Sequence, residues 1–140
     1  MPDNETNWLS PRLRASLVRF ANSLVVIASL RPRMTVQLVK TFLTVAADEG
    51  LTVGALATKC GISPTMACRH VQDLSHTNRH LKPGLGLVAT AQHVHGDRRE
   101  IRVYLTEHGI AVFRQMKETC LTGPTWRILP DRNDWSGAPE

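Results

Sequence analysis

Gly61 separates two short segments that each begin with the signals of a helix, and this arrangement limits the fold more than any other feature. Thr52 can cap a helix over residues 53–60. Ser63-Pro64 is a cap followed by a proline at the first helical position, and it opens a second helix over 64–75. Two short helices joined by a tight turn with a glycine are typical of a helix-turn-helix, whose second helix enters the major groove of DNA.

The hydrophobic pattern changes from a helical period to strict alternation after Gly86. Residues 87–92 and 101–105 alternate between two faces, and Gly96-Asp97 lies between them as a turn. This pattern predicts a two-stranded hairpin that ends at Thr106, the cap of a last helix. The apolar residues of that helix are Ile110, Phe113, Met116 and Cys120.

Two helices are expected before the helix-turn-helix. One starts at Ser10-Pro11 and ends at Arg31-Pro32-Arg33, and the other runs from a Thr35 cap to about Glu49. The first carries an apolar stripe made of Leu13, Leu17, Phe20, Leu24 and Ile27. Such a stripe more often packs inside its own domain. Because this helix lies outside the compact module, we expect it to pair with its mate across a dimer axis, alone or with the last helix.

The order of these elements is that of a winged helix. The predicted fold class is mainly α with a small β-hairpin wing, that is, an α+β winged helix-turn-helix. We expect residues 1–33 to form an N-terminal helical arm with a role in dimerisation, residues 34–120 to form a DNA-binding domain, and residues 121–140 to form an irregular tail.

Two motifs make this pattern more specific. Leu51 to Ala57, followed by Gly61-Ile62-Ser63-Pro64-Thr65, resembles the helix-turn-helix of the multiple antibiotic resistance regulator (MarR) family. Asp97-Arg98-Arg99, followed by Leu105-Thr106-x-x-Gly109, resembles that family's wing signature. Together the motifs cover about residues 34–117. The resemblance implies a bacterial or archaeal cytoplasmic transcription factor, usually a homodimer and usually a repressor, that reads a pseudo-palindromic operator.

Family members often form a ligand pocket beside the dimer contact, so the resemblance also implies a small-molecule effector. Two features depart from the family pattern. Residues 75–85 form a longer link before the wing than is typical, which predicts an insertion loop. The tail after residue 121 is punctuated by proline and glycine, which leaves little room for the long C-terminal helix that usually closes the family's dimer.

The second helix of the helix-turn-helix carries side chains suited to DNA. The residues expected on its groove-facing side, opposite Met66, Val71 and Leu74, are Ser63, Thr65, Ala67, Cys68, Arg69 and Gln72. Hydroxyl groups can bind phosphates or base edges, Gln72 can pair with adenine, and Arg69 can bind guanine or a phosphate. The alternative is a solvated helix face with no ligand.

The tip of the predicted hairpin carries the second group of candidate DNA ligands. Arg98 and Arg99 can enter a narrow minor groove or bind its phosphates. Asp97 would be repelled by a phosphate, so we expect it to orient Arg99 by pairing with it. The alternative is a polar turn with incidental charges.

The composition excludes some classes of protein and leaves others open. The chain of 140 residues has 17 Lys and Arg against 12 Asp and Glu, so its net charge of +5 allows a nucleic-acid partner without requiring one. The most apolar run, Leu24 to Leu30, is far shorter than the roughly 20 residues of a membrane span. Three cysteines at wide spacings favour a reducing compartment. We therefore predict a cytoplasmic protein without a membrane partner.

No cofactor, metal or catalytic role is predicted. His76-x-x-x-His80 has the spacing of helical metal ligands, but no Cys-x-x-Cys pair accompanies it and polar surface is the favoured interpretation. Cys68 next to Arg69 could be a redox switch, although a buried or inert thiol is the more frequent case. No phosphate loop or nucleophile motif stands out, so an enzyme is not expected.

Two classes of function remain. The first is a dimeric regulator whose recognition helices enter successive major grooves and block a promoter. The second is a winged-helix docking protein, or an accessory factor in replication or recombination, without sequence-specific binding. Salt-dependent binding to an inverted repeat that is lost on Arg98→Ala and Arg99→Ala would favour the first class. Equal affinity for all duplexes, or none, would favour the second.

Overall fold

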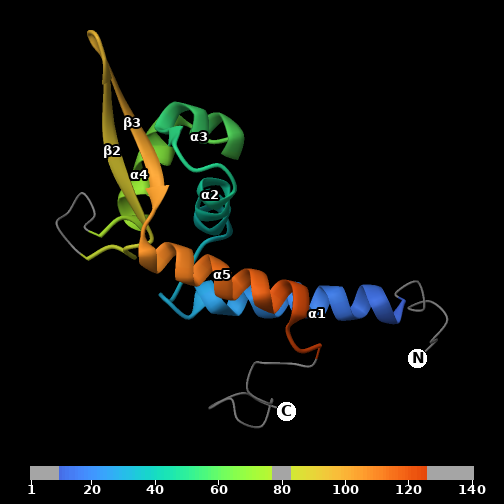
Figure 1. Cartoon of the computed structure of the whole chain (residues 1–140). Helices are drawn as coiled ribbons and strands as arrows, with labels where there is room; N and C mark the ends of the chain where they lie inside the picture. The colour runs from blue at the N-terminus through green and yellow to red at the C-terminus, as the bar shows by residue number, and fades with distance from the viewer. Residues whose placement is uncertain (1–9, 77–82, 126–140) are drawn as a thin grey trace.

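The computed structural model of the chain describes residues 10–76 and 83–125. Its helices are α1 (Pro11–Ala28), α2 (Val36–Ala47), α3 (Val53–Cys60), α4 (Pro64–Leu74) and α5 (Glu107–Thr122). Its strands are β1 (Leu51–Thr52), β2 (Val88–His95) and β3 (Arg98–Leu105). Figure 1 shows α1 and α5 side by side as an arm, while α2, α3 and α4 gather beside the β2–β3 hairpin. The predicted winged helix-turn-helix, mainly α with a small β wing, is confirmed.

Each described helix begins at a serine or threonine whose side-chain oxygen accepts a backbone N–H three residues on. The five caps are Ser10, Thr35, Thr52, Ser63 and Thr106. Such a bond satisfies one of the amides left free at a helix start. Gly61 ends α3 with a φ of +69°, a conformation that favours glycine. These local signals explain why the helix starts could be predicted.

The sheet has the order β1-β3-β2, and both pairings are antiparallel. His95 pairs with Arg98, so the hairpin turn holds two residues, Gly96 and Asp97. Gly96 has a φ of +63°, while Asp97 has a negative φ, and this is the pattern of a type II′ turn. Strand β1 was not predicted, because two residues are too few to show alternation.

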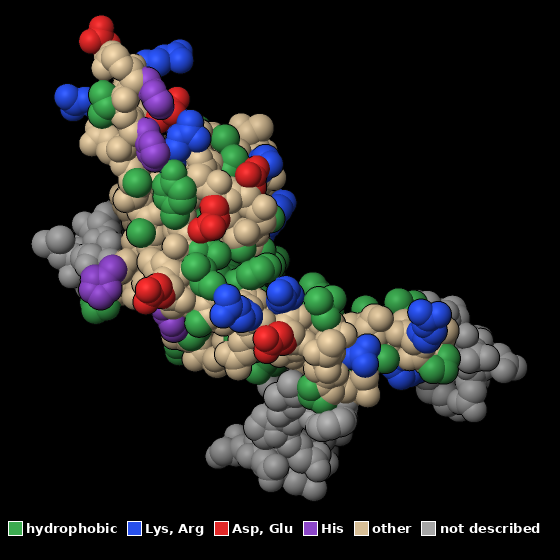
Figure 2. All heavy atoms as spheres, viewed as in Figure 1, with side chains coloured by type: hydrophobic (Ala, Val, Ile, Leu, Met, Phe, Trp, Pro, Cys, Tyr) green, Lys and Arg blue, Asp and Glu red, His purple; other side chains and the backbone are tan. Residues whose placement is uncertain are grey.

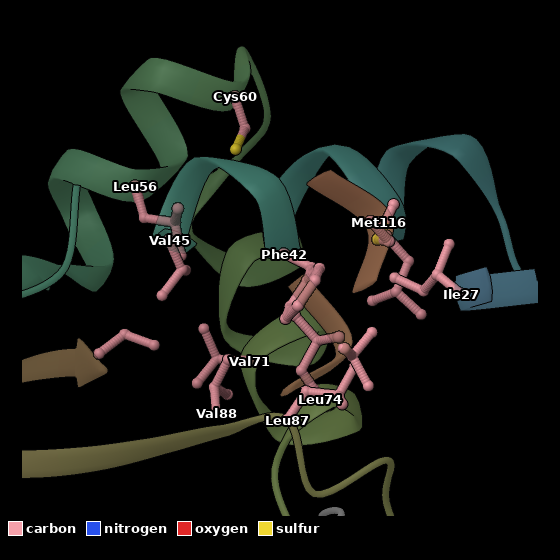
Figure 3. Close-up of a cluster of buried hydrophobic side chains, with 13 residues drawn as sticks. Ile27, Phe42, Val45, Leu56, Cys60, Val71, Leu74, Leu87, Val88 and Met116 are labelled. Atoms are coloured by element: carbon pink, nitrogen blue, oxygen red, sulfur yellow. The ribbon is translucent and has the colours of Figure 1, made fainter. Parts of the chain in front are cut away.

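The core lies where the helices meet the base of the hairpin, and every helix contributes to it (Figure 3). Its largest fully buried side chains are Ile27, Phe42, Leu56, Leu74 and Leu87. Ile27 is only 1% exposed. The expectation that Ile27 contributes to a dimer contact is therefore wrong, because α1 inserts its last turn into the core of its own chain.

The start of α5 is held against the entry to β2. The backbone N–H of Thr106 donates to the Leu87 carbonyl at 3.0 Å, and its hydroxyl donates to the Gly86 carbonyl at 2.6 Å. A Cβ added at Gly109 would lie 2.0 Å from the carbonyl oxygen of Leu87. The Leu-Thr-x-x-Gly motif thus joins the arm to the hairpin by a cap and a close backbone approach.

Most of the predicted insertion loop lies outside the described residues, as does the tail from residue 126. The described ends of the link are hydrogen-bonded to each other and to the end of α4. Gly84 N–H donates to the His76 carbonyl at 2.8 Å, and Leu85 N–H donates to the Asp73 carbonyl at 3.0 Å. α5 continues to Thr122, so the first two residues of the predicted tail belong to this helix. In the described ranges, no helix has the length and apolar character to cross a membrane.

Candidate nucleic-acid interface

Helix α4 buries one face and exposes the other. Its buried residues are Ala67, His70, Val71 and Leu74, at the spacing of one helical stripe. The predicted ligands on the exposed side are Ser63, Thr65, Cys68, Arg69 and Gln72. The structure therefore brings five of the six predicted side chains to one accessible surface.

The sixth predicted residue, Ala67, is 0% exposed and cannot face DNA. Met66, which was assigned to the core, is 37% exposed. The two exchange sides because a small side chain on the packing face lets α4 lie close to its neighbours. The greater hydrophobicity of methionine favoured Met66 for the core. In the structure α4 lies too close to its neighbours for a long side chain, so Ala67 takes the buried position.

His70 is a buried polar residue that the sequence did not single out. Its Nδ1 lies 2.8 Å from Oγ1 of Thr41, on α2, and that hydroxyl also contacts the Gln37 carbonyl at 3.0 Å. Burial lowers the pKa of His70, and the negative charge of Asp73 opposes this shift. The spacing of four from Leu74, which the sequence assigned to the core, was the signal that could have placed His70 on the packing face.

The lowered pKa predicts how stability depends on pH. The folded chain favours neutral His70, so this residue contributes stability above the ordinary histidine pKa, and that contribution is lost as the pH falls below it. Urea titrations measure the free energy of unfolding at each pH. Between about pH 7 and pH 5.5, this free energy is expected to fall less in His70→Gln than in wild type. His108→Gln, at an exposed position on α5, is the control and is expected to keep the wild-type profile. An unchanged profile in His70→Gln would contradict the assignment.

The register of the hairpin places Arg98 and Arg99 on opposite faces. Arg98 shares its face with Arg102 and Tyr104, while Arg99 shares its face with Val103, which is buried. Arg98, Arg99 and Asp97 are all exposed at the tip. The two arginines can therefore reach in two directions from one tip.

The predicted pair between Asp97 and Arg99 is not formed in the described part of the chain. The ion pair of the hairpin joins Arg102 and Glu100 instead, at 2.8 Å, and Arg102 also donates to the Gly50 carbonyl at 2.8 Å. The Arg102 guanidinium lowers the pKa of Glu100. Arg102 thus braces the hairpin against the chain before β1, a role that sequence reasoning missed because Gly50 is distant in sequence.

Charge gathers on the hairpin and along the arm. Figure 2 shows Lys, Arg and His side chains along the hairpin, and further Lys and Arg along the arm. On the hairpin, the His93 ring and the Tyr104 hydroxyl are hydrogen-bonded at 3.0 Å. The exposed basic groups at the tip and Arg69 on α4 suit a polyanionic partner.

The predicted dimer stripe divides into an exposed and a covered part. Leu13, Leu17 and Phe20 are exposed, whereas Leu24 is half-buried and Ile27 belongs to the core. A groove of about 830 Å³ lies where α1 faces α2. Its apolar lining includes Phe20, Leu24, Met34, Val36, Val39 and Leu43, and Lys40 and Lys59 also line it.

The cysteines and the histidine pair were minor candidates for a redox or metal site. Cys60 is buried, but Cys68 is exposed, so of the expected buried or inert thiol at Cys68 the structure excludes the buried case. His80 lies outside the described residues, so the His76-x-x-x-His80 spacing stays a sequence pattern only. Residues 10–76 and 83–125 hold no group of three or more His, Cys, Asp or Glu that could bind a metal.

Solved structures share this architecture. The crystal structure of RV1404 from Mycobacterium tuberculosis is 28% identical, with a TM-score of 0.62 over 87% of this chain and 75% of that one. A transcriptional regulator of the MarR family from Silicibacter pomeroyi is 22% identical, with a TM-score of 0.52 over 79% of this chain and 66% of that one. The chain has the fold of a MarR-family regulator.

Within this fold, α4 is the second helix of the helix-turn-helix and the β2–β3 hairpin is the wing. The resemblance noted in the sequence motifs is therefore confirmed at the level of the fold. Comparison of the sequence with family models and with curated proteins finds no match.

Proposed function

We propose that the chain is a DNA-binding transcriptional regulator of the MarR type, a dimeric cytoplasmic repressor without catalytic activity. The observation that carries this proposal is the single exposed face of α4, with Arg69 and Gln72 on it, while the opposite face packs into the core. A helix held from behind in this way presents its outer side chains to a major groove without rearrangement.

The side chains divide into readers of base edges and binders of the backbone. Arg69 can donate two hydrogen bonds to guanine, and Gln72 can pair with adenine. Ser63 and Thr65, at the start of α4, can donate their hydroxyl hydrogens to a phosphate, since the Ser63 oxygen accepts the N–H of Met66. Arg98 and Arg99 leave the wing tip from opposite faces, which suits binding along a minor groove.

A dimer would explain the exposed apolar stripe on α1. Leu13, Leu17 and Phe20 point away from their own core and present an apolar surface to solvent. Pairing with a second copy would cover them, and two-fold symmetry would match a pseudo-palindromic operator. The groove between α1 and α2 adjoins this stripe at Phe20, and we propose it as the place where a small apolar effector would bind.

Selection from a library of random duplexes tests the function. The purified chain is expected to enrich an inverted repeat whose half-site centres lie about 10–10.5 base pairs apart or a multiple of this spacing. Binding to the enriched duplex is expected to weaken steeply with salt. Failure to enrich any sequence, with equal affinity for all duplexes or none, would favour the winged-helix docking protein instead.

Alanine at the wing tip is expected to weaken DNA binding without removing sequence preference. Arg98→Ala and Arg99→Ala should each lower the affinity for the selected duplex about tenfold and reduce the salt slope by about one, because each removes one contact to the backbone or the minor groove. Fluorescence anisotropy at several salt concentrations measures both effects.

Arg12→Ala is the matched control for the wing variants. It removes the same charge from an exposed position in the first turn of α1, and Figure 1 shows the start of this helix at the end of the arm away from the hairpin. Its affinity is expected to stay within about twofold of wild type, because charges beyond a Debye length are screened. Equal losses in all three variants would show that net charge alone controls binding.

A further inference from the structure

Arg31 joins the end of the arm to the recognition helix. Its Nη1 donates to Oδ1 of Asp73 at 3.0 Å, and its Nη2 donates to Oδ2 at 2.9 Å. Two parallel bonds of this kind fix the orientation of both side chains as well as their distance. Arg31 follows α1 in the chain, and Asp73 lies in the last turn of α4.

Asp73 is also bonded to the entry of the wing. Its carbonyl accepts the N–H of Leu85 at 3.0 Å, next to the bond from Leu87 to Leu74. One residue of α4 therefore contacts the arm through its carboxylate and the segment before β2 through its backbone. The three parts that would meet DNA or a second copy are linked at this point.

The geometry of the linker supports a rigid connection. Pro32 follows Arg31 directly, and Arg33 has a φ of +60°, an uncommon conformation for a residue other than glycine. The Arg31 and Asp73 side chains are each about one-third exposed, at 33% and 34%, so the pair is partly shielded from solvent. The hydrogen bond to Asp73 raises the pKa of Arg31 further.

We propose that the Arg31–Asp73 pair is a positioning element that sets the angle between the α1–α5 arm and α4. This inference rests on the proposed function, because in a dimer that angle determines the spacing of the two recognition helices. Neither residue is proposed to touch DNA or the second copy. The bond between His70 and Thr41 joins α4 to α2 and does not involve the arm.

A distance measurement tests the pair without DNA. Spin labels are attached to Cys68, which is exposed on α4, and to a cysteine replacing exposed Arg12 on α1, in a Cys120→Ser background. Labelled chains are diluted with unlabelled chains so that distances within one chain are recorded. The distribution is expected to be narrow with the pair intact and clearly broader in Arg31→Gln and in Asp73→Asn.

Lys59→Gln is the control for the labels, since it removes another ion pair of the same module, with Asp48 at 2.8 Å, on the exposed surface. Its distribution is expected to match that of the parent. Equal widths in all variants would overturn the proposal. Melting temperatures recorded on the same samples identify any variant that is unfolded, and the Arg31→Lys variant then serves in its place, because lysine keeps the charge but not the paired bonds.

DNA affinity provides the second test, with the selected duplex and a single half-site as probes. Arg31→Gln and Asp73→Asn change the net charge in opposite directions, so a simple field effect would move their affinities apart. If the pair is a positioning element, both variants should lose about fivefold in affinity for the full duplex and less than twofold in affinity for the half-site. The double variant should be no weaker than either single variant.

The outcomes separate the two proposals. If no duplex is enriched, the proposed function fails, and the label distances still decide whether the pair holds the arm. If the duplex binds but the two variants shift its affinity in opposite directions, or weaken half-site and full duplex equally, the positioning role fails while DNA binding stands.

Discussion

Gly109→Ala is expected to lower the free energy of unfolding by about 3 kcal/mol, because the new methyl group meets fixed backbone. A Cβ at this position would lie 2.0 Å from the Leu87 carbonyl oxygen and 2.9 Å from its carbon. The start of α5 would have to move away from the entry to β2. That movement would strain the two bonds between Thr106 and the carbonyls of Gly86 and Leu87. Urea unfolding followed by circular dichroism measures the change.

Gly54→Ala is the matched control, because Gly54 also lies in the first turn of a helix. A Cβ there would meet no atom within 4 Å. The substitution is expected to be neutral or to stabilise by up to about 1 kcal/mol, since alanine favours the helix. Wild-type stability in Gly109→Ala would contradict the close approach between α5 and the segment before β2.

The double variant Leu17→Glu, Phe20→Glu is expected to be monomeric and to bind the inverted repeat about 100-fold more weakly than wild type. Leu17 is 48% exposed and Phe20 is 53% exposed within one chain, so both positions tolerate a charge in the folded monomer. In the proposed dimer the same charges would be buried without partners. Sedimentation velocity measures the mass, and fluorescence anisotropy measures the affinity.

Arg12→Glu is the control for the dimer variant. It adds acidic charge to the same helix at an exposed position outside the apolar stripe. It is expected to keep the wild-type mass, with at most a small loss of affinity. If the double variant still has the mass of a dimer, the proposal that α1 forms the contact between two copies is contradicted.

The parts of the fold that could be predicted are those that depend on residues close in sequence. Each helix start follows from a hydroxyl three residues before the amide that it accepts. The hairpin follows from alternation on both sides of Gly96 and from the positive φ of that glycine. These interactions span a few residues, so the pattern contains both partners.

The parts that were missed depend on residues distant in sequence. Strand β1 exists because two residues pair with β3 about fifty positions later. The exchange of Met66 and Ala67 follows from how closely α4 packs on its neighbours. Arg102 donates a hydrogen bond to the Gly50 carbonyl, and no sequence pattern near either residue predicts that bond. A periodic hydrophobic pattern indicates that one face of a helix or strand is buried. It does not identify the element that packs on that face.

The candidate interface shows the same division. Arg98 and Arg99 became candidates through the wing motif that contains them. Arg69 and Gln72 became candidates through their place on the second helix of the predicted helix-turn-helix, because groove-reading helices use these residue types. The register alone showed that the two wing arginines leave opposite faces. The DNA-binding role itself stays a proposal for the selection experiment.

The sequence by itself determined the order of the five helices and the hairpin, the helix starts and the hairpin turn, because short-range capping and turn chemistry specify them. Only the tertiary structure decided that Ile27 belongs to the core, that a groove adjoins α1, and that Arg31 reaches Asp73. The physical reason is distance along the chain. The partners in these contacts are 42 residues apart in the case of the ion pair, and packing brings them together only after the helices have formed.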